Sequence, residues 1–190
     1  PLYNNDLVEV TAQYAGTVID RKFREAIQAQ EAGDGVLRDS LSSEGLAMMQ
    51  RLDALLDARP DLRLEKWIRT ARAKAATPEG KAQLEQNART QVTVWGGPDL
   101  YDYASKVWSG LVKDFYAERW RLYFDLMKKG TEETKITAAL VRWEEEWTKK
   151  SSDPADRPAG DAVAAARALM SSLDASLHLV PSPRIEAERP

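Results

Sequence analysis

Glycine and proline divide this sequence into segments whose apolar residues recur every three or four positions. That spacing gathers apolar side chains on one face of an α-helix. Runs of β-branched residues and stretches of alternating apolar and polar residues are scarce, so no strand of useful length is predicted. The sequence therefore predicts an all-α fold, an irregular helical bundle of about seven helices.

Helix ends follow from capping chemistry. Thr77 can cap a helix that has Pro78 in its first position, and Lys128, Lys129 and Gly130 are typical of a C-terminus. The predicted helices are, in chain order, 6–30; one that carries Leu41 to Leu55 and stops before Arg59-Pro60; a short one with Leu64 to Ala71; one that starts at Pro78, carries Leu84, Ala88 and Val92 and reaches the Trp95 loop; 99–129; 131–150; and 161–179. The apolar face of the first is predicted to hold Leu7, Val10, Tyr14, Val18, Phe23 and Ile27. The longest is predicted to be capped by Asp99, with Leu100, Ala104, Val107, Leu111, Phe115, Leu122 and Leu126 on its apolar face.

Composition excludes several classes of function. The net charge is −3 and basic residues are interleaved with acidic ones, which argues against a nucleic-acid partner. No apolar run reaches the roughly 18 residues of a membrane span. The chain has no cysteine, and its single histidine, His178, is expected to be a cap or surface residue, so neither a metal site nor a cofactor is predicted. Because the chain starts at Pro1, we interpret it as a cut piece or processed product of a longer polypeptide.

The break between two strongly periodic helices is the first candidate site. It reads Trp95-Gly96-Gly97-Pro98, and Pro98 prevents the preceding helix from continuing. A large flat ring at such a break can face a cleft and stack on a sugar or another flat ligand. The alternative is that Trp95 only plugs the end of the bundle.

The residues after this break form the second candidate site. Tyr101, Asp102 and Tyr103 fall on the predicted first turn of the longest helix, where free N–H groups favour polar or anionic ligands. Alternatively, the two tyrosines pack with their hydroxyls at the surface and Asp102 complements the helix dipole.

Two clusters combine charge with tryptophan. Residues 118–121 predict a mixed-charge face that is either solvated or docked on a neighbouring domain. Trp143 and Trp147 lie on one helix face with Glu144, Glu145 and Glu146 around them. Paired carboxylates are the usual equipment of glycosidases, but acids in an exposed helical run lack the burial that separates their pKa values, so catalysis is not predicted here. The two tryptophans could instead anchor a partner if the chain is a scaffold.

No P-loop, dinucleotide fingerprint, HExxH motif or nucleophile elbow is present. If the protein has a catalytic constellation, we expect it to lie outside these residues.

The segment from Leu84 to Phe124 resembles glycoside hydrolase family 89, the α-N-acetylglucosaminidases. The family pattern Asn-x-Arg-x-Gln-x-Thr-x-Trp-Gly is matched from Asn87 to Gly96, and Asp-Tyr-Ala-x-Lys is matched from Asp102 to Lys106. Similar Gly-Leu-Val, aromatic-Tyr and Arg-Trp-Arg signals follow, at Gly110-Leu111-Val112, Phe115-Tyr116 and Arg119-Trp120-Arg121. The resemblance extends more loosely to Asp6-Leu7-Val8-Glu9-Val10-Thr11 and to Gly160-Asp161.

The resemblance implies that this chain is most of a C-terminal helical domain, over 1–179, with an extended tail over 180–190. Family members carry two catalytic glutamates on a (β/α)₈-type barrel, so no catalytic residue is assigned here. The helical domain is expected to wall one side of the sugar pocket, with Trp95, Leu100 and Tyr103 as substrate-binding residues. Asn87 and Arg89 are expected to hold the loop.

The implied function is part of a retaining exo-α-N-acetylglucosaminidase acting on terminal α-linked N-acetylglucosamine, without a metal or cofactor. Its partner would be the catalytic barrel of the same polypeptide, and this chain alone is expected to be inactive. A secreted, periplasmic or lysosomal location would fit the family. The helical domain is expected to begin before Pro1, which leaves apolar surface exposed. The alternative is a free-standing helical module that binds carbohydrate or protein.

Overall fold

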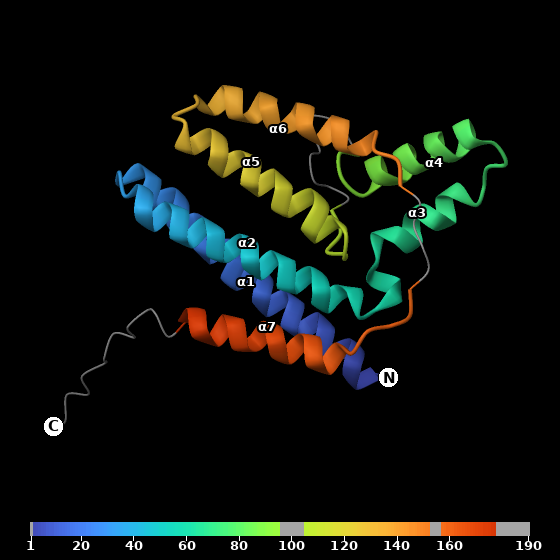
Figure 1. The fold of residues 1–190 in the computed structure, drawn as a ribbon, viewed down its shortest axis with the longest axis horizontal. Coiled ribbons are helices and arrows are strands. Elements are labelled where there is room, and N and C mark those ends of the chain that lie inside the picture. Colours follow the sequence, from blue (N-terminus) through green and yellow to red (C-terminus); the bar gives the residue numbers. More distant parts are fainter. Residues whose placement is uncertain (1, 96–104, 153–156, 178–190) are drawn as a thin grey trace.

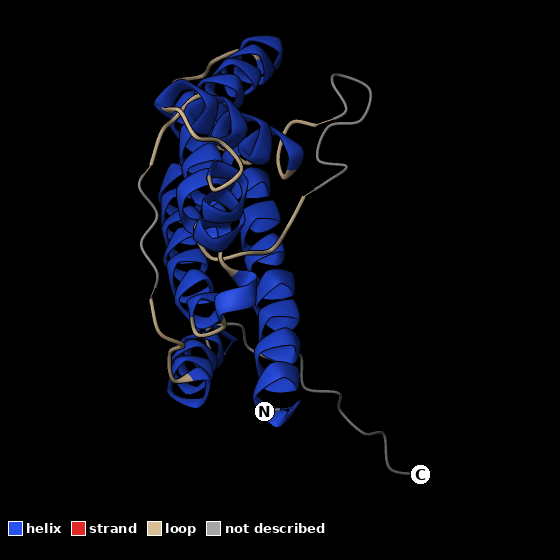
Figure 2. Ribbon diagram, turned by 90° about the vertical axis from the view of Figure 1, so that its right-hand side faces the viewer, coloured by secondary structure: helices blue, strands red, loops and turns tan. Residues whose placement is uncertain are grey.

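The computed structural model describes residues 2–95, 105–152 and 157–177, and within them it confirms an all-α fold of seven α-helices (Figure 1). Figure 2 shows helices and loops and no strand in this part of the chain. The elements are α1 (Leu2–Glu31), α2 (Gly35–Asp57), the 3-10 helix η1 (Pro60–Leu62), α3 (Leu64–Arg72), α4 (Pro78–Gln91), the π-helix η2 (Val112–Tyr116), α5 (Ala117–Lys128), α6 (Glu133–Thr148) and α7 (Ala162–Leu177).

Side chains cap three of the helices. Thr77 Oγ1 accepts a hydrogen bond of 3.1 Å from the Gly80 N–H, which confirms the predicted start of α4. Asp161 Oδ1 accepts from the N–H groups of Val163 and Ala164 at the start of α7. Asp34 does the same for α2. These oxygens satisfy N–H groups that have no partner within the helix.

The first of two hydrophobic cores, the aliphatic core, lies between α1, α2, α7 and the η2–α5 segment. In Figure 1 the antiparallel pair α1 and α2 forms the middle layer, with α7 on one side and α5 on the other. Gly45 of α2 lets the helices approach closely, because a Cβ there would lie 2.3 Å from the Phe23 ring. The members of this core include Val8, Ala15, Phe23, Leu52, Leu55, Val112, Phe124, Ala166, Leu169 and Leu173.

The second core, the aromatic core, lies between α3, the end of α4, η2 and α6. Phe115 is at its centre, with its ring centroid 4.9 Å from that of Trp147 and 5.4 Å from that of Trp143. The buried members are Leu64, Ile68, Val92, Leu111, Phe115 and Trp147. The two cores meet at η2, because Tyr116 packs against both.

The prediction of one helix over 99–129 is wrong over residues 105–110, whereas residues 111–128 are helical, with a π-helical stretch at Val112–Tyr116. Residues 105–108 are not helical, and regular helix begins only after Gly110, whose φ is +88°. Ser109 instead forms a parallel bridge with Arg63, which holds the chain extended. Val107, predicted to face the core, is therefore exposed, while Leu111 and Phe115 are buried as predicted.

The predicted apolar face of the first helix is also partly wrong. Val10 is 68% exposed and Tyr14 is 39% exposed, whereas Val18 and Phe23 are buried as predicted. The buried face of α1 includes small side chains such as Ala15 and Ala26, and it is rotated from the predicted stripe of large ones. Large apolar side chains are thus left on the outside of α1.

Arg63 joins distant parts of the chain. Its buried guanidinium donates hydrogen bonds to the carbonyl oxygens of Asp57, Arg157 and Pro158. The Gly160 N–H donates to the Ala58 carbonyl at 3.2 Å. Together these bonds bring the segment before α7 back to the end of α2. The predicted boundary at residue 179 and the predicted tail over 180–190 lie outside the described residues.

Candidate functional site

Trp95 lies at the C-terminal end of α4, where the helix gives way to a turn over residues 92–95. Trp95 is 50% exposed, so about half of the residue is accessible to solvent. Two residues before it, Thr93 is buried and its Oγ1 donates a 2.7 Å hydrogen bond to the Arg89 carbonyl. A half-exposed ring on an anchored backbone is suited to stacking on a flat or apolar ligand face.

The last turn of α4 is also held from α3. The Trp67 indole N–H donates a 2.9 Å hydrogen bond to the Ala88 carbonyl, and the Trp67 ring packs near that of Trp108. Val92, which directly follows α4, is buried in the aromatic core. The helix end that leads to Trp95 is therefore bound on two sides.

A charged and polar cluster, which we call the Glu85 cluster (Arg72, Glu85, Arg89 and Ser152), joins the last turns of α4 to α3 and to the segment after α6. Glu85 is fully buried, and its Oε1 accepts from Arg89 at 2.8 Å and from Ser152 Oγ at 2.7 Å. Its Oε2 accepts from Arg72 at 2.6 Å. Every oxygen of this buried carboxylate thus has a charged or polar partner.

The pKa of Glu85 reflects this balance. Burial alone would raise it, but hydrogen bonds from Ser152, Arg89 and Arg72 outweigh the burial and lower the pKa below the usual range of a glutamate. A carboxylate held in its charged form by two guanidinium groups is a poor general acid. The Glu85 cluster therefore serves to hold structure rather than to exchange protons.

The predicted site residues are only partly within the described structure. Trp95 is described, whereas Leu100 and Tyr103, with the neighbouring Tyr101 and Asp102, lie outside the described residues. Of the two residues expected to hold the loop, Asn87 is exposed and Arg89 is buried in the Glu85 cluster. His178 also lies outside the described residues.

The acidic run between Trp143 and Trp147 differs from the prediction. Glu144 is buried rather than exposed, and its carboxylate forms an ion pair of 2.5 Å with Arg119 of α5. Trp147 is 1% exposed, so it belongs to the protein interior and does not anchor a partner. This run joins α5 to α6, and its tryptophans build the aromatic core.

Asp53 is a third buried carboxylate, besides Glu85 and Glu144, that the sequence did not reveal. Its Oδ1 accepts from the N–H groups of Gly110, at 2.7 Å, and Lys113, at 3.1 Å, and its Oδ2 accepts from Ser109 Oγ. These bonds cap the start of the η2–α5 segment from a helix more than fifty residues earlier in the chain. Burial raises the pKa of Asp53 above its ordinary value, and the backbone hydrogen bonds reduce that shift without cancelling it.

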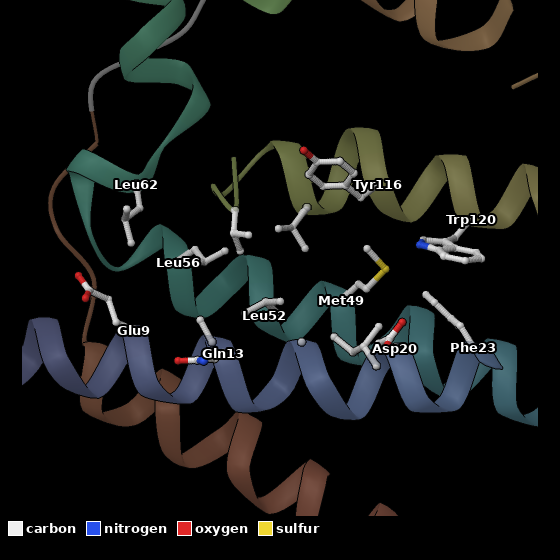
Figure 3. A pocket seen from close by; sticks show the side chains of 15 residues that line it. Glu9, Gln13, Asp20, Phe23, Met49, Leu52, Leu56, Leu62, Tyr116 and Trp120 are labelled. Carbon is white, nitrogen blue, oxygen red and sulfur yellow. The ribbon is translucent and has the colours of Figure 1, made fainter. Parts of the chain in front are cut away.

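An apolar groove of about 620 Å³ lies away from Trp95, between α1, α2 and the η2–α5 segment (Figure 3). Figure 3 shows Met49, Leu52 and Leu56 on its floor and Trp120 beside Phe23 at one end. Glu9 and Asp20 also line it, but Glu9 pairs with Arg59 and Asp20 pairs with Arg24. The groove therefore offers apolar packing surface and no group suited to acid–base chemistry.

Among residues 2–95, 105–152 and 157–177, no group of three or more acidic or histidine side chains could hold a metal ion. Within the same ranges, no helix has the length and apolarity that crossing a membrane requires.

Comparison with known proteins gives a consistent result. A family model described as the α-N-acetylglucosaminidase C-terminal domain matches residues 1–172. Human α-N-acetylglucosaminidase is 33% identical over 132 residues, which cover 67% of this chain and 17% of the human protein. The matched region thus spans well under a quarter of this relative's length.

Two solved structures have the same fold. A family 89 glycoside hydrolase from Clostridium perfringens, in complex with 2-acetamido-1,2-dideoxynojirmycin, has a TM-score of 0.77 and 24% identity, covering 90% of this chain and 21% of that one. A variant from the same organism, in complex with its substrate GlcNAc-α-1,4-galactose, has a TM-score of 0.76 and 22% identity, covering 89% and 21%. At these identities the likeness establishes the fold.

Proposed function

This chain belongs to the α-N-acetylglucosaminidase C-terminal domain family, and from that premise we propose that it is the helical C-terminal portion of a retaining exo-α-N-acetylglucosaminidase. In this proposal it walls the substrate pocket of a catalytic barrel that it does not itself contain. The barrel supplies the two catalytic carboxylates, and the reaction releases terminal α-linked N-acetylglucosamine with retention of configuration.

The observation that carries the proposal is the state of Trp95 in the family motif. Its ring is half-exposed, yet the backbone two residues before it is buried and hydrogen-bonded. A ring held in this way provides an apolar platform for the C–H face of a sugar. Leu100 and Tyr103 complete the wall, with Tyr103 contributing a hydroxyl, and all three residues position the sugar without reacting with it.

Exposed apolar surface supports a large partner. The outside of α1 carries Val10 and Tyr14, and the groove beside α2 is lined by apolar side chains. Such surface is typical of protein contacts. The relatives also continue far beyond the matched region, since that region covers 17% of the human protein and 21% of the bacterial one.

The first test is turnover by the isolated chain. With an aryl α-N-acetylglucosaminide as substrate, we expect release of the aryl alcohol at the rate of the uncatalysed reaction. Turnover above that background would contradict the proposal. Protein fluorescence titrated with N-acetylglucosamine gives the complementary measurement, because tight binding by this chain alone would favour a free-standing carbohydrate-binding module.

The second test uses the polypeptide in which this chain is joined to the barrel. We expect Trp95→Ala to raise KM for the aryl glycoside about tenfold, equivalent to ~1.4 kcal/mol, with a smaller change in kcat. Val36→Ala is the control, since it removes an exposed apolar side chain at the start of α2 that has no role in the proposed site. An unchanged KM in Trp95→Ala would remove Trp95 from the site.

A further inference from the structure

Two residues of the Glu85 cluster, Glu85 and Arg89, lie in the last turns of α4, just before the turn that ends in Trp95. Their contacts indicate a role in addition to stabilising the fold. We propose that Glu85 and Arg89 are positioning residues that fix the direction in which Trp95 leaves α4. The consequence for substrate rests on the proposed function above, whereas the positioning itself does not.

Arg89 is the centre of this arrangement. Its Nε and Nη2 both donate to Glu85 Oε1, at 3.1 and 2.8 Å, and Nη2 also lies 3.2 Å from Ser152 Oγ. The guanidinium carbon stands 4.6 Å from the centroid of the Trp147 ring. One planar group therefore contacts α4, α6 and the segment after α6 at once, which an ammonium on a flexible stem cannot reproduce.

Glu85 holds the Arg89 side chain through an ion pair within the same helix. The two residues are four apart, so their side chains lie on one face of α4, next to the buried Ala88 and Val92. Arg72 of α3 binds the other carboxylate oxygen. The carboxylate thus ties the last turns of α4 to α3 as well as to Arg89.

The connection from Arg89 to Trp95 runs through the backbone. The Arg89 carbonyl accepts from Thr93 Oγ1, at 2.7 Å, and from the Val92 N–H, at 3.3 Å. The Thr93 N–H in turn donates to the Thr90 carbonyl at 3.2 Å. Because Val92 and Thr93 are both buried, the path of the chain is fixed up to two residues before Trp95.

Stability alone does not account for charges in this place. Well-packed apolar side chains of similar volume often stabilise a protein as much as a buried ion pair does. What a buried pair adds is directional, because its hydrogen bonds are satisfied in one geometry. That property is useful where a helix end must present a ring at a defined angle.

Fluorine NMR of the chain labelled with 5-fluorotryptophan tests the positioning. The chain has six tryptophans, and Trp95→Phe identifies the Trp95 resonance by its loss. We expect Arg89→Lys and Thr93→Val each to shift or broaden that resonance. We expect Arg89→Lys to shift the Trp147 resonance as well, because the Arg89 guanidinium faces the Trp147 ring.

Arg38→Lys is the matched control. Arg38 is 7% exposed and Arg89 is 6% exposed, and both bind a carboxylate, but Arg38 lies in α2. We expect Arg38→Lys to leave the Trp95 resonance in place. A Trp95 resonance that stays in place in Arg89→Lys would overturn the proposal; if Arg89→Lys does not fold, Glu85→Gln decides by the same readout.

Kinetics of the polypeptide that includes the barrel test the consequence. We expect Arg89→Lys to raise KM several-fold with kcat less affected, and to have little further effect in a Trp95→Ala background. A moved Trp95 resonance with an unchanged KM would overturn the link to substrate. If Trp95→Ala itself leaves KM unchanged, the proposed contact of Trp95 with the sugar is wrong. The NMR experiment still tests separately whether Glu85 and Arg89 position Trp95.

Discussion

The two hydrophobic cores of this molecule differ in the side chains that form them. The aliphatic core joins long helices through Val, Leu, Met and Ala side chains, and Gly45 allows close contact between α1 and α2. The aromatic core joins shorter helices through Phe115 and Trp147, and it lies against the Glu85 cluster. Ring contacts occur in both cores, as between Phe23 and Trp120 in the first, and the second also packs against the Arg89 guanidinium, which stands over the Trp147 ring. The candidate site belongs to the second.

The largest expected effect comes from emptying either core. Trp147→Ala should cost about 3–5 kcal/mol of unfolding free energy, and Leu169→Ala about 2–5 kcal/mol. Because Tyr116 packs against both cores, each variant should still unfold in one transition. Denaturant unfolding followed by far-UV circular dichroism and tryptophan fluorescence checks this. Non-coincident transitions would mean that the cores are independent units.

Breaking the Glu85 cluster is the next test. Glu85→Ala removes the carboxylate that two guanidinium groups share and should cost about 3 kcal/mol. Asp20→Ala, which removes the partner of Arg24 in an exposed pair on α1, should have a much smaller effect. Thermal and denaturant unfolding measure both. Equal effects would show that the charges of the aromatic region are as dispensable as those on the surface.

A smaller effect tests the close contact in the aliphatic core. Gly45→Ala gains helix propensity but brings a methyl group into the Phe23 ring, so we expect a net loss of about 1 kcal/mol. Gly16→Ala is the matched control in α1, because a Cβ there meets nothing within 4 Å. It should stabilise the chain by up to about 1 kcal/mol. If Gly45→Ala also stabilised it, the two helices would have room to separate.

The smallest effect is a difference in pH dependence between two of the buried carboxylates, Glu85 and Asp53. The pKa of Glu85 is lowered, so its stabilising contribution is present above the ordinary glutamate pKa and is lost as pH falls through the folded value. The pKa of Asp53 is raised, so the native state takes up its proton first, and that uptake favours folding as pH falls.

Unfolding free energy measured between pH 6 and about pH 3 separates the two carboxylates. Glu85→Gln should lose stability less steeply with acid than the unmodified chain, and Asp53→Asn should lose it more steeply. Slopes that change in the same direction in both variants would contradict the assignment of opposite shifts.

The regular parts of the fold could be predicted because their determinants are local. Thr77 caps α4 and Asp161 caps α7, and both signals lie within three residues of the N–H groups they serve. The start of the η2–α5 segment could not be predicted, because its cap is Asp53, 57 residues before Gly110. The apolar pattern of the sequence continues through residue 110, whereas in the structure the helix begins only after Gly110, which has a positive φ.

The residues of the candidate site were also predicted only in part. Trp95 and Arg89 followed from the family motif, but the burial of Glu85 was missed. A signal was present, since Glu85 stands three and seven residues before the apolar Ala88 and Val92 and so shares their helix face. Its partner Ser152 is 67 residues away, and no local pattern specifies that contact.

The hydrogen bonds from Arg63 to the carbonyl oxygens of Arg157 and Pro158 also bear on the order in which the helices pack during synthesis. The aromatic core has all its buried side chains once Trp147 has been made, whereas the aliphatic core needs Leu169 and Leu173 of α7. Until α7 emerges and Arg157 and Pro158 dock on Arg63, one side of the α1–α2 pair faces water. Among the helices of this domain, α1 and α2 are therefore made before the others and covered last, and a chain truncated before α7 should expose the apolar side chains that α7 covers.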